Sequence, residues 1–202
     1  MKLYYAPGAC SLAPHIVAEE LGTKVDLVKV DLGAKKTADG ADFSKINPKG
    51  YVPALGLDSG EVLTEGPVIS QYLADQKPQS GLVPQAGTLE RYRLMETLGY
   101  INSEIHKTYS ALFDKSAPQE VRDNRSAYLK KRYAVLDQKL ADRDYLFGDR
   151  FTVADAYLFV VTGWAPHVKV DLSEFANLQA FQKRVAARPA VQAAMKAEGL
   201  IK

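Results

Sequence analysis

The spacing of hydrophobic and polar positions changes several times along the first part of the chain. Residues 2–5 form a short aromatic run that ends before Pro7, which is typical of a strand. From residue 12 apolar side chains recur at helical spacing as far as Gly22, which is expected to close the helix. Residues 27–31 then predict a second strand. A strand, a helix and a strand at this spacing indicate two parallel strands joined by a right-handed crossover.

The next stretch predicts a short helix, a hairpin and another helix. The short helix is expected at 42–46, and an extended segment begins at Val52-Pro53. Asp58-Ser59-Gly60 supplies a tight turn between two strands. Pro67 suits the first turn of the helix that follows. Together with the parallel pair, this order predicts a compact α/β domain with one mixed sheet.

Periodicity is lost between residues 76 and 87, where two prolines and two glycines fall close together. We therefore expect a first domain at 1–80, a linker at 81–87 and a second, all-helical domain at 88–202. One helix is predicted to face the core with a stripe of apolar side chains, namely Tyr92, Met95, Leu98, Ile101 and Ile105. A neighbouring stripe is small and polar, and it consists of Gly99, Asn102, Ser103 and His106.

A capping box marks the start of the most apolar helix of the second domain. Thr152 can cap the amide of Asp155, whose carboxylate can reach back to the amide of Thr152. This pattern favours a capping role for Asp155 over a catalytic one. Two further helices are expected at 177–187 and 189–198, on either side of the break before Pro189.

Composition excludes several classes of function. The chain has 202 residues, 47% of them hydrophobic, and a net charge of +2, so nothing favours binding to nucleic acid or an anionic membrane. One cysteine permits no intramolecular disulfide, and the histidines lack partners at metal-ligand spacing. With no signal peptide or membrane span in the sequence, we expect a cytoplasmic protein without a metal.

Four features carry candidate chemistry, and each also has a purely structural interpretation. Cys10 precedes a helix whose amides and dipole could stabilise a thiolate, or it is an inert buried thiol. Val52-Pro53 is either an ordinary trans edge segment or a cis bond that presents backbone groups to an extended peptide. Glu65-Gly66 could hold an ammonium and a carboxylate, or only complement the helix dipole. His106 could donate to a thiolate or be an interface histidine.

Taken together, these features describe a site for a short peptide that carries a carboxylate, an ammonium and a thiol. At this point the whole chain resembles a bacterial glutathione S-transferase of the beta class. The shared motifs are Met1-Lys2-Leu3-Tyr4-Tyr5, Pro7-Gly8-Ala9-Cys10-Ser11-Leu12, Asn47-Pro48-Lys49-Gly50, Val52-Pro53-Ala54-Leu55, Leu63-Thr64-Glu65-Gly66, Gln71-Tyr72-Leu73-Ala74-Asp75, Glu104-Ile105-His106-Lys107 and Phe151-Thr152-Val153-Ala154-Asp155-Ala156-Tyr157-Leu158.

The resemblance implies a thioredoxin-like domain, an all-helical domain and a homodimer. It implies that glutathione is the co-substrate, with Cys10 beside its sulfur and His106 near it. The backbone at Tyr51, Val52 and cis Pro53 would pair with the cysteinyl residue. Lys35, Glu65 and Gly66 are the other implied contacts within the subunit. Ser103 and Glu104 would reach the tripeptide bound to the other subunit. An apolar electrophile pocket between the domains would use Tyr109, Phe113, Trp164 and His167. Gly66 departs from the serine of many relatives, which implies one hydroxyl contact fewer.

The mechanism expected is activation of the glutathione thiolate, which attacks a hydrophobic electrophile in a detoxification reaction. Tyr5 and Ser11 are rival activating groups. Two other functions stay open: a thiol-disulfide oxidoreductase that forms a mixed disulfide at Cys10, and a non-enzymatic protein that binds ligands in the same cleft.

Overall fold

The computed structural model describes all residues, 1–202, and divides them into two compact units. The first unit comprises residues 1–83 and 187–202, and the second comprises residues 84–186. The elements of the first unit are β1 (Lys2–Tyr5), α1 (Leu12–Glu20), β2 (Asp26–Asp31), β3 (Lys36–Thr37), α2 (Phe43–Ile46), β4 (Ala54–Gly56), β5 (Val62–Thr64), α3 (Gly66–Asp75), η1 (Pro78–Ser80) and α9 (Pro189–Ala197). Those of the second are α4 (Leu89–Tyr100), η2 (Ile101–His106), α5 (Tyr109–Phe113), α6 (Gln119–Lys139), α7 (Val153–Thr162), η3 (Ala165–Val168) and α8 (Ala176–Ala186).

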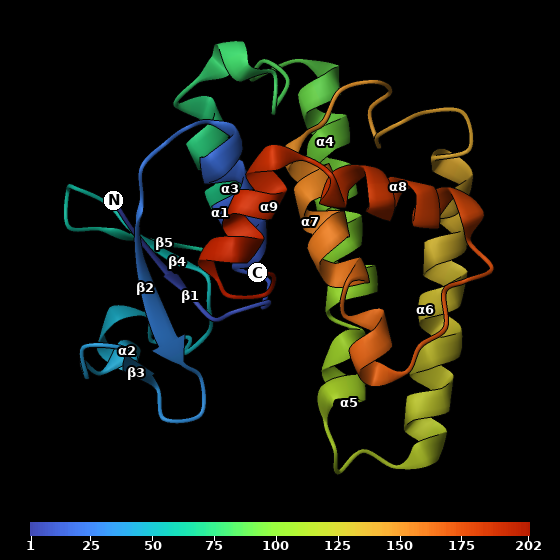
Figure 1. Ribbon diagram of the computed structural model, residues 1–202, viewed down its shortest axis with the longest axis horizontal. Helices are drawn as coiled ribbons and strands as arrows, with labels where there is room; N and C mark the ends of the chain where they lie inside the picture. The colour runs from blue at the N-terminus through green and yellow to red at the C-terminus, as the bar shows by residue number, and fades with distance from the viewer. The chain divides into compact units, whose positions relative to one another are not determined.

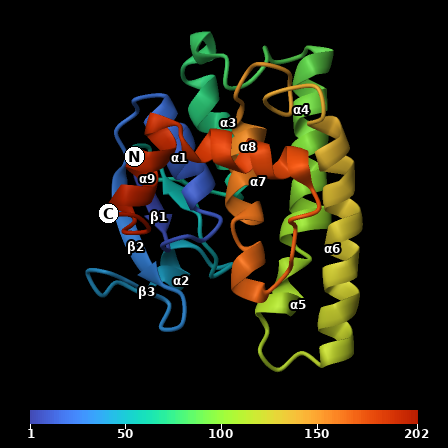
Figure 2. The same ribbon diagram turned by 45° about the vertical axis from the view of Figure 1, so that its right-hand side comes forward.

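The first unit is built on a five-stranded sheet with the order β3-β2-β1-β4-β5. β1 is central; it pairs parallel with β2 and antiparallel with β4, which confirms the predicted crossover and hairpin. Figures 1 and 2 show α1, α3 and α9 along one face of this sheet. An apolar cluster in this unit joins Phe43 of α2 to Val30, Val52 and Ala54. The predicted thioredoxin-like domain is therefore present.

The last helix belongs to the first unit rather than to the helical one. α9 packs against α1, and the Arg188 guanidinium bonds both carboxylate oxygens of Glu20, at 2.6 and 2.9 Å. The buried Glu198 carboxylate also reaches His15 of α1, at 2.9 Å from its Nδ1 atom. The division of the structure thus differs from the predicted one, in which residues 88–202 formed a single domain. Contacts between residues so distant in sequence leave no periodic signal.

The helix predicted to carry the apolar stripe from Tyr92 to Ile105 is interrupted, and two of the five residues expected in its core face are exposed. Residues 101–106 form a π-helix, η2, between α4 and α5. Leu98, Ile101 and Ile105 are buried as expected, whereas Tyr92 and Met95 are 59% and 47% exposed. The buried face of α4 instead passes through Leu94, so an apolar stripe remains on its surface.

The regular elements of the second unit are all helices (Figure 1). Every residue of α7 is buried. The predicted capping box at its start is confirmed, because Thr152 and Asp155 cap each other reciprocally. The buried Asp155 carboxylate also accepts the amide N–H of Leu146 at 2.8 Å. None of the helices of the chain combines the length and the apolar character needed to cross a membrane.

Candidate functional site

The loop between β1 and α1 holds Cys10 as a protonated thiol. Its Sγ atom donates a hydrogen bond to the carbonyl oxygen of Val52 at 3.2 Å. Burial raises the pKa of the Cys10 thiol to about 12; the amides of Cys10 and Ser11 oppose this shift, while the Glu65 carboxylate adds to it. The helix dipole and amides therefore do not produce a thiolate at Cys10, contrary to one of the two interpretations of the sequence, because desolvation outweighs them.

The Val52-Pro53 bond is cis, as the resemblance implied. Asn47 Nδ2 donates to the carbonyl oxygen of Tyr51 at 2.7 Å and so fixes the loop just before this bond. The N–H of Val52 forms no hydrogen bond within the chain, although its carbonyl accepts from Cys10. A free amide beside the open end of a short strand can pair with the backbone of an extended peptide.

Glu65 and Gly66 lie at the start of α3, on the far side of the hairpin. Glu65 has a φ of 69°, a conformation that costs a side-chain-bearing residue energy and that clusters at binding sites. Its half-exposed carboxylate pairs with Lys49 Nζ at 2.8 Å. Gly66 is the first residue of α3, so its N–H has no acceptor within the helix. A Cβ atom added to Gly66 would lie 3.5 Å from Pro53 Cγ and 3.9 Å from the Cys10 carbonyl oxygen, so these segments adjoin.

Lys35 and Tyr51 complete the group of predicted residues in the first unit. Lys35 also has a positive φ, 54°, and its Nζ atom donates to the carbonyl oxygen of Gly50 at 2.9 Å. The same ammonium lies 5.8 Å from the centre of the Tyr51 ring, which is 71% exposed. One edge of the first unit therefore brings together a cation, free backbone groups, a carboxylate and a thiol.

The two rival activating groups on this unit are engaged by their surroundings. The fully buried Ser11 hydroxyl bonds the backbone N–H and carbonyl of Ala6, both at 3.2 Å, which stabilises the loop. Burial, with a smaller effect of the Glu198 carboxylate, raises the pKa of Tyr5. Neither hydroxyl is therefore poised to ionise at neutral pH.

In the second unit, His106 ends η2 and is held by two residues that the sequence did not single out as functional. Its Nδ1 atom lies 2.5 Å from the hydroxyl of Tyr157, and this hydroxyl donates to Asn102 Oδ1 at 2.9 Å. The His106 ring also packs edge-on to Trp164, with centroids 4.8 Å apart. Asn102 appeared only as part of a polar stripe, and Tyr157 only within an apolar helix, so the sequence offered no signal that joined them.

Three of the four residues expected to line an electrophile pocket form one aromatic cluster. The rings of Tyr109, Phe113 and Trp164 are in mutual contact, with centroids 5.5 to 6.1 Å apart. Tyr109 is fully buried and its hydroxyl lies 2.9 Å from the Tyr133 hydroxyl, so its ring supports the cluster from within the core and does not line an open surface. His167 is exposed on η3 and makes no ring contact with the other three.

Ser103 and Glu104 point to different surroundings. The exposed Ser103 hydroxyl donates to the Gly99 carbonyl oxygen at 3.0 Å. The Glu104 Oε2 atom accepts a hydrogen bond from the Tyr128 hydroxyl and forms an ion pair with Arg132, whose Nε atom is 2.9 Å away. One carboxylate oxygen of Glu104 is thus used within its own unit, and Oε1 is left for a ligand.

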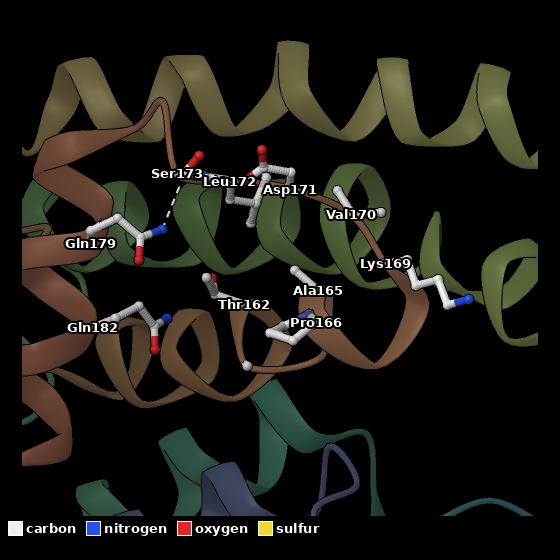
Figure 3. Close-up of a pocket in the computed structure, with 11 residues that line it drawn as sticks. Thr162, Ala165, Pro166, Lys169, Val170, Asp171, Leu172, Ser173, Gln179 and Gln182 are labelled. Carbon is white, nitrogen blue, oxygen red and sulfur yellow. Dashed lines mark hydrogen bonds between the residues drawn. The ribbon is translucent and has the colours of Figure 1, made fainter.

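A cavity of about 530 Å³ lies within the second unit and contains none of the predicted site residues. Its walls are the end of α7, η3, residues 169–173 and the amides of Gln179 and Gln182 on α8 (Figure 3). Gln179 Nε2 donates to the Leu172 carbonyl oxygen at 3.0 Å and closes one side. No group of three or more His, Cys, Asp or Glu side chains is arranged to hold a metal ion anywhere in the chain.

Comparison with known proteins gives matches to both units. The family described as "Glutathione S-transferase, N-terminal domain" matches residues 1–75, and "Glutathione S-transferase, C-terminal domain" matches residues 100–189. Glutathione S-transferase GstA of Escherichia coli O157:H7 is 46% identical over 99% of this chain and all of its own. The beta-class glutathione S-transferase of Sphingomonas chungbukensis is 51% identical, with a TM-score of 0.96 over all of both chains. A sphingomonad glutathione S-transferase solved with glutathione is 49% identical, with a TM-score of 0.95 over all of both chains.

Proposed function

The chain belongs to the beta class of the glutathione S-transferase family and is a glutathione transferase, and we propose that its first unit binds glutathione along the edge formed by Cys10, Val52-Pro53 and Glu65-Gly66. The observation that carries this assignment is the convergence of these residues on one edge. The 3.2 Å bond from Cys10 to Val52 joins two of them, and a Cβ atom added to Gly66 would lie 3.5 Å from Pro53 Cγ, so the start of α3 adjoins the same edge.

Each group on this edge matches one part of the tripeptide. The N–H and carbonyl of Val52 pair with the backbone of the cysteinyl residue, next to Tyr51 and Pro53. The Glu65 carboxylate takes the γ-glutamyl ammonium, and the Gly66 N–H takes the neighbouring carboxylate. Lys35 takes the glycine carboxylate at the other end. Glutathione fits because its charges and its extended backbone complement these donors and acceptors.

For the chemical step, Cys10 and His106 act on the glutathione sulfur. A thiol near pKa 8.5 is only a few per cent ionised at neutral pH, so donors and acceptors that favour the thiolate raise the reactive fraction. Cys10 keeps its own proton, so it is not the nucleophile; in the complex its S–H is proposed to turn from the Val52 carbonyl oxygen to the glutathione thiolate. The thiolate then attacks an electrophilic carbon and expels the leaving group.

The electrophile is proposed to be small and apolar, and to contact the half-exposed ring of Phe113 beside Trp164, while the fully buried Tyr109 ring supports both from within the core. His167 stays a weaker candidate because it stands apart from this cluster. Detoxification of such compounds in the cytoplasm, where the glutathione pool is kept reduced, is the proposed physiological role.

A homodimer is proposed as the working assembly. α4 exposes Leu89, Tyr92 and Met95 at 67%, 59% and 47%, an apolar stripe that monomeric surfaces seldom leave open. Ser103 and the Oε1 atom of Glu104 are proposed to reach the tripeptide bound to the other subunit. Sedimentation of a Tyr92→Glu variant tests the assembly, because a buried charge at this stripe would produce monomers.

The function is tested by retention on immobilised glutathione and by conjugation of chlorodinitrobenzene. Specific elution with free glutathione and measurable conjugation are expected. In Cys10→Ala, conjugation should persist at a reduced rate, since the cysteine donates a hydrogen bond rather than forming a covalent intermediate. Disulfide reduction that exceeds conjugation in the native protein and vanishes in Cys10→Ala would instead favour the oxidoreductase. Absence of both retention and conjugation would contradict the proposed enzyme.

A further inference from the structure

Lys49 belongs to the motif Asn47-Pro48-Lys49-Gly50 and has no role in the proposed function, although its side chain contacts a residue of the proposed site. We propose that Lys49 and Glu65 together recognise the zwitterionic α-amino acid end of glutathione, with Lys49 binding the α-carboxylate and Glu65 the ammonium. This role rests on the proposed function and deepens it, because it names the feature of the ligand that this end of the site selects.

The ammonium group of Lys49 is held by two acceptors at the end of β5. Its Nζ atom donates to Thr64 Oγ1 at 2.9 Å and to Glu65 Oε1 at 2.8 Å. A lysine ammonium has three N–H donors, and the third one of Lys49 has no acceptor within the chain. The group is therefore oriented by two hydrogen bonds and retains one charged donor for a ligand.

The Glu65 carboxylate is likewise only half used. Lys49 occupies its Oε1 atom, whereas Oε2 accepts no hydrogen bond within the chain. The two side chains are 55% and 57% exposed, so a ligand can approach both from solvent. The pair thus presents a positive and a negative group side by side, and each has an unused position for a hydrogen bond.

A buried side chain fixes the turn that carries Lys49. Asn47 is 2% exposed, and its Oδ1 atom accepts the N–H of Lys49 at 3.2 Å. Its Nδ2 atom donates to the carbonyl oxygen of Tyr51 at 2.7 Å. One asparagine therefore joins Lys49 to the segment just before Val52-Pro53, whose backbone is proposed to pair with the cysteinyl residue of the same ligand.

Stability does not account for this arrangement. Exposed ion pairs contribute little to the folded state, because water screens them and ordering two long side chains costs entropy. Glu65 also has a φ of 69°, which is unfavourable for a residue with a side chain and is found most often at binding sites. A pair of this kind at a strained position is better explained by recognition of a ligand.

An α-amino acid end complements the pair because its two charges lie next to each other, as do those of the protein. With the ligand ammonium at Glu65 Oε2 and the α-carboxylate at the third N–H of Lys49, charges alternate in a ring and each has neighbours of opposite sign. A ligand with the ammonium alone would instead place a second cation beside Lys49 on one carboxylate, and like charges repel.

The test combines a substitution with a ligand that lacks the carboxylate. γ-Aminobutyryl-cysteinylglycine is glutathione without its α-carboxylate, and it keeps the ammonium and the thiol. In isothermal titration, Lys49→Met is expected to raise Kd for glutathione about fivefold. For the analogue, Kd should stay the same or fall, because the substitution removes only the repelling cation. An equal rise in Kd for both ligands would overturn the inference.

Lys45→Met is the matched control. Lys45 is an exposed lysine on α2, so this variant removes the same charge from the same unit without touching the pair. Its Kd should equal the native value for both ligands. A loss of glutathione affinity as large as that in Lys49→Met would assign the effect to general positive charge and contradict a specific contact. A near-native Tm verifies that each variant is folded, as expected for exposed side chains.

Kinetics distinguish binding at this end of the ligand from action on the sulfur. Lys49 is proposed to bind the end of the tripeptide that is remote from the thiol, so Lys49→Met should raise KM for glutathione and leave kcat for conjugation unchanged. A lower kcat at saturating glutathione would contradict the assignment. Failure of the proposed function looks different, because the native protein would then not bind glutathione at all. An unchanged Kd in Lys49→Met would rule out only the role of Lys49.

Discussion

The thiol of Cys10 donates a hydrogen bond to the carbonyl oxygen of Val52, across 3.2 Å. The bond links two residues with different proposed roles. The glutathione sulfur is proposed to lie beside Cys10, and the glutathione backbone is proposed to pair with Val52. A cysteine that keeps its proton at neutral pH is a poor nucleophile, because the thiolate is the reactive form, but it retains an S–H group that can donate a hydrogen bond. The relationship favours conjugation, in which the substrate sulfur reacts, over a covalent route through Cys10.

The thiol of Cys10 should resist ionisation until strongly alkaline pH. Its pKa is raised to about 12 by burial, so the folded protein is expected to react slowly with iodoacetamide up to about pH 10, whereas an unfolded chain titrates near pKa 8.5. Because Cys10 is the only cysteine, the reaction of the whole protein reports on this group alone.

The rate of alkylation against pH, with and without denaturant, provides the measurement. Addition of glutathione should not accelerate it. A folded protein whose rate rises with a midpoint near pH 7 would show that the loop stabilises a thiolate after all, and would revive the oxidoreductase.

The carboxylate of Glu65 should account for a large share of the affinity for glutathione. Glu65→Gln removes the charge that pairs with the ammonium of the ligand, and we expect Kd to rise by about tenfold or more, or about 1.5 kcal/mol, with little change in Tm. Glu65 is more than half exposed and its ion pair with Lys49 is superficial, which is why stability should change little.

Glu61→Gln serves as the matched control, since Glu61 is an exposed glutamate on the same hairpin and bonds Ser59 instead. Isothermal titration of both variants with glutathione should affect only Glu65→Gln. Equal losses in the two variants would point to the general charge of the hairpin rather than to a specific contact.

Replacing Gly66 by serine should strengthen glutathione binding. An added Cβ atom would meet its nearest neighbour, Pro53 Cγ, at 3.5 Å, which is ordinary van der Waals contact, and Gly66 does not have a positive φ. The new hydroxyl can bond the ligand carboxylate next to the Gly66 N–H, which we expect to contribute about 1 kcal/mol, or roughly fivefold in Kd.

Gly66→Ala isolates the hydroxyl, because alanine adds the same Cβ atom without the oxygen. Kd should fall in Gly66→Ser and stay near the native value in Gly66→Ala. A similar gain in both would assign the effect to backbone restriction, and a loss in both would show that the approach to Pro53 is closer than van der Waals contact.

Local sequence patterns predicted the helices, strands and turns whose signals lie among neighbouring residues. The features that these patterns missed depend on contacts between residues far apart in the sequence. The strand at 2–5, the turn at Asp58-Ser59-Gly60 and the capping box at Thr152 each depend on neighbouring residues, and all three are confirmed. The place of α9 in the first unit depends on pairs such as Arg188 with Glu20, 168 residues apart, which no periodicity records. Tyr92 and Met95 were misassigned because an apolar stripe looks the same whether it faces a core or a surface.

The candidate site was predicted residue by residue, but its chemistry was not. Position at a helix start, with its amides and dipole, left a thiolate and an inert buried thiol as open alternatives for Cys10. Desolvation opposes ionisation, and its size depends on how deeply the folded chain buries the Cys10 sulfur. The depth of burial cannot be obtained from the sequence. Tyr157 shows the same limit, because its role comes from one hydroxyl aimed at η2 within an otherwise apolar helix.

Asp155 should make stability depend on pH between about 4 and 6. Burial raises its pKa from 3.8 to about 6, although Leu146 and Thr152 donate hydrogen bonds that oppose the shift. The folded chain therefore holds this proton to higher pH than the unfolded chain does. Its contribution to the free energy of unfolding is greatest below about pH 4 and falls as the pH rises to about 6, by roughly 3 kcal/mol.

Urea unfolding of the native protein and of Asp155→Asn across this range tests the prediction. The amide cannot titrate, so the difference in unfolding free energy between the two proteins should shrink as the pH rises from about 4 to 6. A constant difference across the range would mean that the capping bonds hold Asp155 ionised.

Glu198 should hold the last helix to the loop that carries Cys10. Its buried carboxylate bonds His15 Nδ1 through Oε1 and accepts the Gly8 N–H through Oε2, both at 2.9 Å. Glu198→Ala removes the acceptor shared by the buried His15 Nδ1 and the Gly8 N–H, so it is expected to lower the free energy of unfolding by about 2 kcal/mol or more. Glu198→Gln keeps an acceptor and should lose less.

The control is Lys196→Ala, an exposed position on the same helix. Denaturant unfolding should rank Lys196→Ala as the most stable of the three variants and Glu198→Ala as the least. Hydrogen exchange at the Gly8 amide should be faster in Glu198→Ala than in Lys196→Ala, because its acceptor has been removed. If both variants unfold at the same denaturant concentration and exchange Gly8 at the same rate, Glu198 does not anchor this loop, and α9 must be held to the first unit by Arg188 and its apolar contacts.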